Sequence, residues 1–228
     1  MRRAVAAEAV GSFFLFATVV GSGIMAERLA GGDVALALLA NALATGAILF
    51  VLIAMLGPVS GAHFNPAVTL AAMFDRVTAP RNALFYVVAQ LVGGIMGVWS
   101  AHLMFDLPIP QFSQHGRTGT GQWAGEFVAT FGLILTIAGT VRHRPDWIAP
   151  AVALYITAAY WFTSSTSFAN PAITLARSLS DSFAGIAPVD VPAFVVAQLA
   201  GAGAGWLLGR WLFGADAAAG VDDATAGS

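Results

Sequence analysis

The chain has 228 residues, of which 58% are hydrophobic and only 10% are charged, and its formal net charge is −2 at pH 7. Soluble domains carry about 25% charged residues, so this composition is typical of an integral membrane protein. This slightly negative net charge gives no indication of nucleic-acid binding. The absence of cysteine excludes disulfides, thiolate metal sites and cysteine catalysis. We expect neither a metal ion nor a cofactor.

Six apolar segments are long enough to cross a bilayer, which takes about 20 residues of helix. They cover residues 5–26, 34–56, 82–105, 122–141, 147–165 and 190–213. The first follows Met1-Arg2-Arg3, a start that also resembles a signal peptide. Its long apolar run and the lack of a small-residue cleavage site favour a membrane helix instead.

Two shorter segments follow near-identical motifs and are half as long. The tripeptide Asn-Pro-Ala occurs twice, as Asn65, Pro66 and Ala67 and again as Asn170, Pro171 and Ala172. Asn is a preferred helix N-cap, and Pro is tolerated at the first helical position. Each apolar run after the motif has about ten residues, or roughly 15 Å of helix, which is half the hydrocarbon thickness. The motifs therefore predict two half-helices that begin inside the membrane.

The chain repeats itself. Three features recur in the same order: Glu8 and Glu126, then Asn65 and Asn170, then Val87–Leu91 and Val195–Leu199. We therefore predict one channel domain, residues 1–213, made of two copies of a three-helix unit at about 4–105 and 122–213. Because three crossings are an odd number, the copies have opposite topology, and their re-entrant loops meet near the midplane.

These residues resemble the aquaporin or major intrinsic protein family. The doubled Asn-Pro-Ala motif, the six spans and the paired Glu residues carry the resemblance over about residues 4–213. It implies an all-α membrane protein, a right-handed bundle of six transmembrane helices plus two re-entrant half-helices arranged as an inverted repeat. It also implies one pore per subunit and a homotetramer in the lipid bilayer.

The motif residues point to a pore centre. Asn65 and Asn170 can cap with the side-chain oxygen and donate from the amide to a passing solute. Both half-helix N-termini place partial positive charge there, which repels cations but not neutral solutes. Five polar residues are expected to support the loops: Glu8, Glu126, His63, Gln90 and Gln198. Helix–helix hydrogen bonding is an equally plain interpretation of the two Gln residues.

The selectivity filter departs from the family pattern. Most water and glycerol channels of the family place an Arg directly after the second Asn-Pro-Ala, where this chain has Ile173. Alignment with that pattern predicts a constriction formed by Thr45, Ala158, Ser167 and Ile173. A shift in the loop would put Ala159 or Tyr160 in place of Ala158. This filter carries no charge and should be wider than a water-only filter.

Two residues are expected at the outer mouth. Arg177 lies four residues beyond Ile173, so it is one helical turn outward on the same face. It either supplies a displaced guanidinium to the pore or pairs with Asp181, also four residues away. Tyr160 either rims the outer vestibule or only packs.

The arginines predict the orientation, because cytoplasmic loops are rich in them. With the N-terminus inside, the inner side holds most of them: Arg2, Arg3, Arg76, Arg81, Arg142, Arg144 and Arg210. We expect a multi-pass protein of the inner (plasma) membrane with both termini in the cytoplasm. Residues 214–228 are small and polar and predict a disordered cytoplasmic tail.

We expect a passive channel for small uncharged solutes, wider than a strict water pore. Candidate solutes are water, glycerol-like polyols, and neutral arsenic hydroxides or methylated arsenicals. One alternative is a water-selective channel whose filter is rebuilt around Arg177. Another is a secondary transporter, since inverted repeats and broken helices also serve that class. No nucleophile–base pair or metal set indicates an enzyme.

Overall fold

The computed structural model describes residues 1–214, and every regular element in that range is helical. The elements, including two short 3-10 turns, are α1 (Arg2–Leu29), α2 (Val34–Ser60), α3 (Pro66–Phe74), α4 (Pro80–Met104), α5 (Thr120–His143), η1 (Pro145–Trp147), α6 (Ile148–Phe162), α7 (Pro171–Arg177), η2 (Pro188–Asp190) and α8 (Val191–Phe213). This is the predicted all-helical membrane fold. The predicted tail lies outside the described residues, apart from its first residue, Gly214.

Five of these helices, α1, α2, α4, α5 and α8, are long and apolar enough to cross a membrane. The remaining predicted span, residues 147–165, is shorter than expected. Its helix α6 has 15 residues and is extended at its start by the single turn η1. It ends at Phe162 because the backbone is extended at Thr163, where the second re-entrant loop begins.

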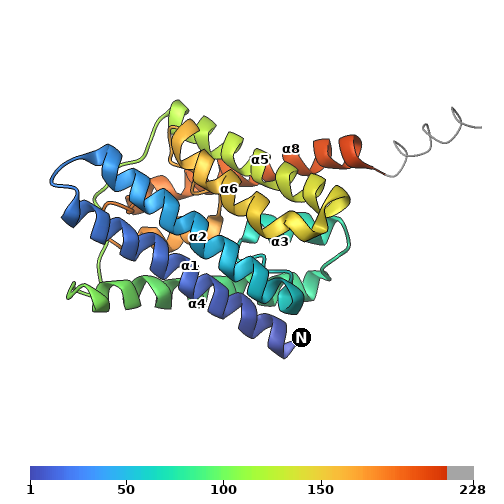
Figure 1. Ribbon diagram of the computed structural model, residues 1–228, viewed down its shortest axis with the longest axis horizontal. Helices are drawn as coiled ribbons and strands as arrows, with labels where there is room; N and C mark the ends of the chain where they lie inside the picture. The colour runs from blue at the N-terminus through green and yellow to red at the C-terminus, as the bar shows by residue number, and fades with distance from the viewer. Residues whose placement is uncertain (215–228) are drawn as a thin grey trace, which may run out of the picture.

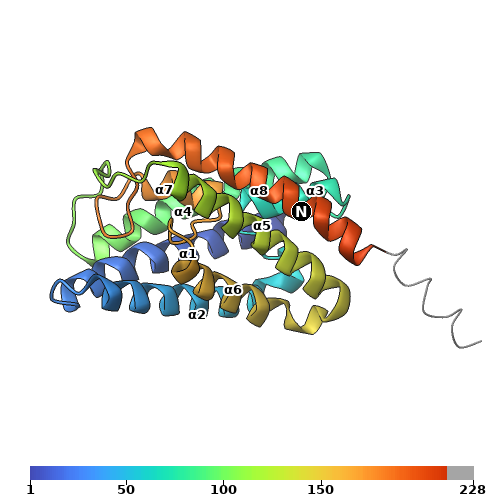
Figure 2. The same ribbon diagram turned by 90° about the horizontal axis from the view of Figure 1, so that it is seen from above.

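The half-helices α3 and α7 begin where the Asn-Pro-Ala motifs predict. The Asn65 side chain accepts a hydrogen bond from the Ala67 backbone nitrogen at 2.9 Å, and that of Asn170 accepts one from Ala172 at 3.0 Å. Pro at the next position loses no bond, because the first N–H groups of a helix have no partner within it. Figure 2 shows α3 and α7 toward opposite ends of the molecule.

The two repeats pack in the same way. Helix α1 packs mainly along α4 in the first repeat, and α5 packs along α8 in the second. Helix α2 contacts both α1 and α6 and so joins the repeats. The N-terminal end of α1 and the C-terminal end of α8 lie at the same end of the bundle in Figure 1. An even number of crossings requires this.

Large apolar side chains cover the outer surface of the bundle as well as its interior. Leu103, Leu154, Val196 and Trp211 are each more than 60% exposed. Such extensive apolar exposure is unusual for a soluble monomer and marks a surface that faces lipid or another subunit. The protein is therefore a multi-pass membrane protein.

Candidate functional site: a cavity between the two repeats

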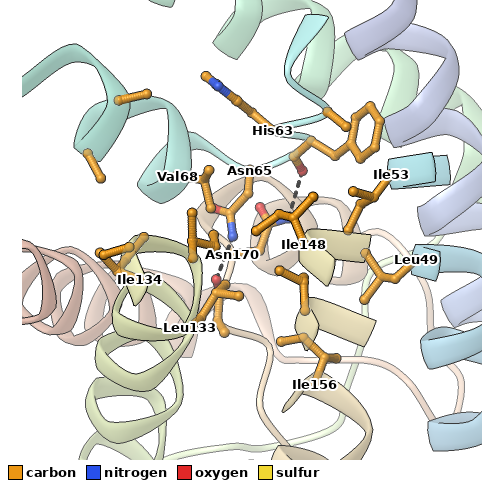
Figure 3. Close-up of a pocket in the computed structure, with 18 of the residues that line it drawn as sticks. Leu49, Ile53, His63, Asn65, Val68, Leu133, Ile134, Ile148, Ile156 and Asn170 are labelled. Atoms are coloured by element: carbon orange, nitrogen blue, oxygen red, sulfur yellow. Dashed lines mark hydrogen bonds between the residues drawn. The ribbon is translucent and has the colours of Figure 1, made fainter. Parts of the chain in front are cut away.

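One cavity of about 940 Å³ runs between the repeats and reaches from the region of Tyr160 and Arg177 to that of Asp75 and Arg210. Both motif asparagines line it. Figure 3 shows them near the middle of the cavity, among aliphatic side chains from α2, α5 and α6. The labelled ones are Leu49, Ile53, Leu133, Ile134, Ile148 and Ile156.

The two loops that enter the cavity share an unusual backbone conformation. Ala62 and Phe64 have φ values of 51° and 47°, and their counterparts Ser167 and Ala169 have 51° and 48°. A left-handed conformation costs a non-glycine residue roughly 1–2 kcal/mol. Such strain persists only where surrounding contacts impose it, and it is concentrated at functional sites. The same strained turns in both repeats indicate a conformation that the site requires.

The two asparagines tie the repeats together at the centre of the cavity. The Asn65 amide nitrogen donates to the Ala169 carbonyl oxygen at 2.7 Å. The Asn170 amide nitrogen donates to the Phe64 carbonyl oxygen at 2.8 Å. Each Asn thus uses one amide hydrogen across the repeat interface, and its second amide hydrogen is available to the lumen. Because their oxygens already cap the half-helices, both side chains are fixed in orientation.

Glu8 anchors the first loop from within α1. Its carboxylate accepts hydrogen bonds from the backbone nitrogens of His63 at 2.9 Å and Phe64 at 2.7 Å. It also accepts from Ser60 Oγ and from Gln90 Nε2, at 2.7 and 2.8 Å. The side chain is completely buried. Four donors compensate for removing this group from water, since an unpaired buried polar group is costly.

Glu126 has the same role in the second loop. It accepts from the backbone nitrogens of Phe168 at 2.8 Å and Ala169 at 2.9 Å, and from the Gln198 amide. Gln198 also donates to Thr174 Oγ1 at 2.8 Å. Gln90 makes the matching bond to Thr69 in the first repeat, at 3.0 Å. Both Gln residues therefore bridge a loop anchor to a half-helix within their own repeat.

Two threonines complete these networks, and the sequence analysis did not single them out. Thr69 and Thr174 each donate to the carbonyl oxygen of the motif Asn, at 3.0 and 2.8 Å. His63 lines the cavity, and its Nδ1 lies 3.1 Å from Thr69 Oγ1. A signal was available, because Thr stands at the same position in both motif copies.

At the end of the cavity near Tyr160, three of the four predicted filter residues come together. Thr45, Ser167 and Ile173 all line it and are at most 5% exposed. The Thr45 hydroxyl lies 3.2 Å from the Tyr160 hydroxyl. Tyr160 therefore contributes an aromatic side chain and a polar group to this region. The buried Ser167 Oγ makes no hydrogen bond within residues 1–214.

Ala158, the fourth predicted filter residue, lies on the exposed face of α6 and is absent from the cavity lining. The lining residues of this helix are spaced four apart: Ile148, Val152, Ile156 and Tyr160. Successive helical residues turn by 100°, so Ala158 points away from the face that carries its neighbours at 156 and 160. The prediction of Ala158 was therefore wrong, and Tyr160 occupies the lumen instead.

Arg177 reaches the cavity. It is only 2% exposed, lies on the cavity wall, and donates through Nε to the Ala184 carbonyl oxygen. Its guanidinium carbon lies 3.3 Å from the centre of the Phe168 ring. The alternative pairing with Asp181 is wrong, because within residues 1–214 the one ion pair joins Arg144 to Asp146.

A second arginine near this end comes from the connection between α4 and α5. Arg117 donates through all three guanidinium nitrogens to backbone carbonyls, those of Gly185, Ser165 and Phe183. The local positive charge affects a neighbour: partial burial lowers the pKa of His115, and Arg117 and Arg177 lower it further. The imidazole is therefore neutral at pH 7.

At the other end of the cavity, a hydrogen bond connects the repeats. Trp206 Nε1 of α8 donates to Asp75 Oδ1, at the end of α3, over 2.8 Å. The Trp206 ring also packs against Phe74, with ring centres 5.2 Å apart. Arg142 and Arg210 line the cavity near this contact.

Comparison with known proteins shows which family this chain resembles. Residues 1–147 match the model of that family, described as "Major intrinsic protein". The chain is 55% identical over 213 residues to a protein named aquaglyceroporin AqpS from Rhizobium meliloti, covering 93% of this chain and 91% of that protein. It is 29% identical over 221 residues to a probable aquaporin TIP2-2 of rice, Oryza sativa subsp. japonica, covering 92% and 87%.

A solved structure shares the fold. The aquaglyceroporin from Plasmodium falciparum superposes on this chain with a TM-score of 0.66 and covers 94% of it, with 96% of the other chain matched. The two sequences are 22% identical, so this likeness is one of architecture.

Proposed function

Because this chain belongs to the major intrinsic protein family, we propose that it is a passive channel for small uncharged solutes, among them water and glycerol-like polyols. The lining of the cavity carries this proposal. The loops and the amides of Asn65 and Asn170 offer hydrogen-bonding groups, while α2, α5 and α6 supply aliphatic side chains. A polyol has hydroxyls and a hydrocarbon backbone, so both kinds of lining match it.

The proposed filter is formed by Thr45, Tyr160, Ser167 and Ile173. It is wider and less charged at residue 173 than the family pattern, because Ile replaces Arg there. The hydroxyls of Thr45 and Tyr160 form one polar side, and Ile173 forms an apolar one. Neutral arsenic hydroxides and methylated arsenicals belong to the same solute class, because they combine hydroxyls with a compact uncharged body.

A water-selective channel is the second candidate. It is favoured by Arg177, which lines the cavity beyond Ile173, and by Tyr160, whose aromatic ring adds bulk to the cavity wall beside Thr45. In this alternative, the guanidinium and the phenol rebuild a filter that excludes polyols. The two candidates differ in the solutes that pass and agree on passive conduction.

Stopped-flow light scattering on proteoliposomes distinguishes them. We expect purified protein to conduct water, glycerol and arsenous acid, each with a low activation energy and without an ion gradient. Empty liposomes and a protein with a bulky residue on the cavity wall beside Asn65 (Val68→Trp) serve as controls. Water flux without glycerol or arsenous acid flux would establish the water-selective channel. Flux that requires an ion gradient would establish a secondary transporter.

We also propose that the protein is a homotetramer in the inner (plasma) membrane with both termini in the cytoplasm. The exposed apolar side chains and the concentration of arginines on one side of the membrane support this arrangement. A C-terminal tag should resist protease in intact spheroplasts and be cleaved after lysis. Cleavage in intact spheroplasts would reverse the assigned orientation.

A further inference from the structure

The guanidinium of Arg177 is held on one side and open on the other. Its Nε is occupied by the Ala184 carbonyl, and its plane lies against the Phe168 ring. The two Nη nitrogens donate to no atom of residues 1–214, yet they are not sealed from solvent. Because Arg177 lines the cavity, these nitrogens face the lumen. Their direction therefore depends on what holds Phe168 and the outer loop in place.

Arg117 holds both. Its Nε donates to Gly185 at 2.8 Å, and its Nη nitrogens lie 3.4 Å from the carbonyl oxygens of Ser165 and Phe183. Its own backbone nitrogen donates to Asp190 Oδ2 at 2.7 Å. The side chain thus connects the second re-entrant loop to the segment after α7. Arg117 does not itself line the cavity.

Phe168 is shared by the two arginines. The guanidinium carbon of Arg117 lies 5.0 Å from the centre of the ring, and that of Arg177 lies 3.3 Å from it. Aromatic faces attract cations, and a planar guanidinium stacks on them. The ring also packs edge-on against Phe194, with centres 5.2 Å apart. Because its backbone nitrogen is bound to Glu126, Phe168 moves mainly through its side chain, and Arg117 is one of the groups that hold the ring.

We propose that Arg117 is a positioning residue of the outer mouth. Through Phe168 and the three carbonyls, it sets the direction in which Arg177 presents its Nη nitrogens to the lumen. It thereby controls the width of the mouth and its barrier to cations, beside an Ile173 that supplies no charge. This inference rests on the proposed function, because it requires a conducting pore. It adds a residue outside the cavity that determines which solutes pass.

The test is a double-mutant cycle in proteoliposomes. The variants are Arg117→Gln, Arg177→Met and the double variant, and the readouts are the glycerol-to-water permeability ratio and proton leak. Arg28→Gln is the matched control, because Arg28 also donates to a carbonyl, that of Phe105, and stacks on its ring at 5.1 Å, away from the cavity. Arg117→Lys keeps the charge but loses the three-pronged clamp.

We expect Arg117→Gln to raise the permeability ratio about threefold or more and to raise proton leak, with a smaller effect in Arg117→Lys. In the Arg177→Met background, Arg117→Gln should change neither quantity further. Arg28→Gln should leave both as in the wild type. Phe168→Leu removes the shared ring and keeps both arginines, so it should have the same effect as Arg117→Gln. It replaces Arg117→Gln in the test if Arg117→Gln does not fold.

Three results would overturn the inference while leaving the channel itself intact. They are an unchanged ratio in folded Arg117→Gln or Phe168→Leu, an equal effect in both backgrounds, and the same effect in Arg28→Gln. A wild-type protein that conducts neither water nor glycerol would instead overturn the proposed function and this inference with it.

Discussion

Asn65 and Asn170 each use both the oxygen and the nitrogen of the side-chain amide, and this limits which residues can replace them. The oxygen caps a half-helix, and one amide hydrogen bonds to the opposite repeat. Ile173, three residues after Asn170, has an aliphatic side chain that forms no hydrogen bond. At the residue scale, both Asn side chains are therefore fixed by their partners, while the side chain of residue 173 is not.

Replacing Ile173 with Arg should narrow the filter. The new guanidinium would add bulk and charge beside Arg177, so glycerol flux should fall more than water flux. We expect the glycerol-to-water ratio to drop about tenfold, equivalent to about 1.4 kcal/mol in relative barrier. Stopped-flow measurements on Ile173→Arg and the control Ile173→Val test this. Equal losses of both fluxes would show that residue 173 does not discriminate between these solutes.

The buried carboxylates should be essential for stability. Glu8→Gln replaces an acceptor of four hydrogen bonds, and Glu126→Gln an acceptor of three, with a group that accepts fewer. Each loop N–H left unpaired costs about 1–3 kcal/mol. Thermal unfolding in detergent should show lower midpoints for both, because each carboxylate accepts from two loop N–H groups. The control Glu27→Gln, at an exposed residue, should behave as the wild type.

At the scale of elements, the closest helix contacts are made by glycines in matching positions of the two repeats. A Cβ on Gly93 of α4 would overlap the Ala9 carbonyl of α1. A Cβ on Gly201 of α8 would overlap the Phe127 carbonyl of α5. Small residues of this kind allow helix backbones to approach one another in a membrane. The α1–α4 and α5–α8 pairs thus form the rigid frame of each repeat.

This packing predicts opposite signs for two Ala substitutions on one helix. Gly203 has nothing within 4 Å of an added Cβ, so Gly203→Ala should stabilise α8 by up to about 1 kcal/mol through helix propensity. Gly201→Ala gains the same propensity but forces α8 away from α5, which costs about 1–3 kcal/mol. Thermal unfolding of both variants decides this. A Gly201→Ala midpoint at or above that of Gly203→Ala would contradict the close contact.

At the scale of the whole molecule, hydrogen bonds join the repeats at the centre of the cavity and toward both of its ends, with Thr45 contacting Tyr160 at one of them. Asn65 and Asn170 bond across the midplane, and Trp206 of the second repeat bonds to Asp75 of the first. Both repeats supply side chains to the cavity, so neither encloses it alone. The apolar exterior is suited to contact with lipid.

An assembly of four copies, each with its own pore, is the expected state in mild detergent. Light scattering corrected for detergent should give four times the chain mass of 23.5 kDa. Because each cavity lies within one chain, mixing in blocked subunits with Val68→Trp should reduce flux in proportion to their fraction. A steeper reduction would indicate that conduction depends on neighbouring subunits.

The sequence alone was sufficient for the membrane class, the duplication and the two half-helices. These features are local: the length of an apolar run is read directly, and Asn followed by Pro is a favoured helix start. The resemblance then pointed to the family that the comparisons identify. The predicted span 147–165 runs three residues beyond its helix α6, at the end that is determined by the loop that follows it.

Only the tertiary structure decided which side chains face the lumen around the filter. Tyr160 replaces Ala158 there because the rotation of α6 about its axis is set by its contacts with α2 and α5. Arg177 turns toward the cavity because the Ala184 carbonyl and the Phe168 ring hold it, and Arg117 braces that ring from a distant loop. Local chemistry determines where helices begin, but the direction of a side chain depends on partners that lie far apart in the sequence.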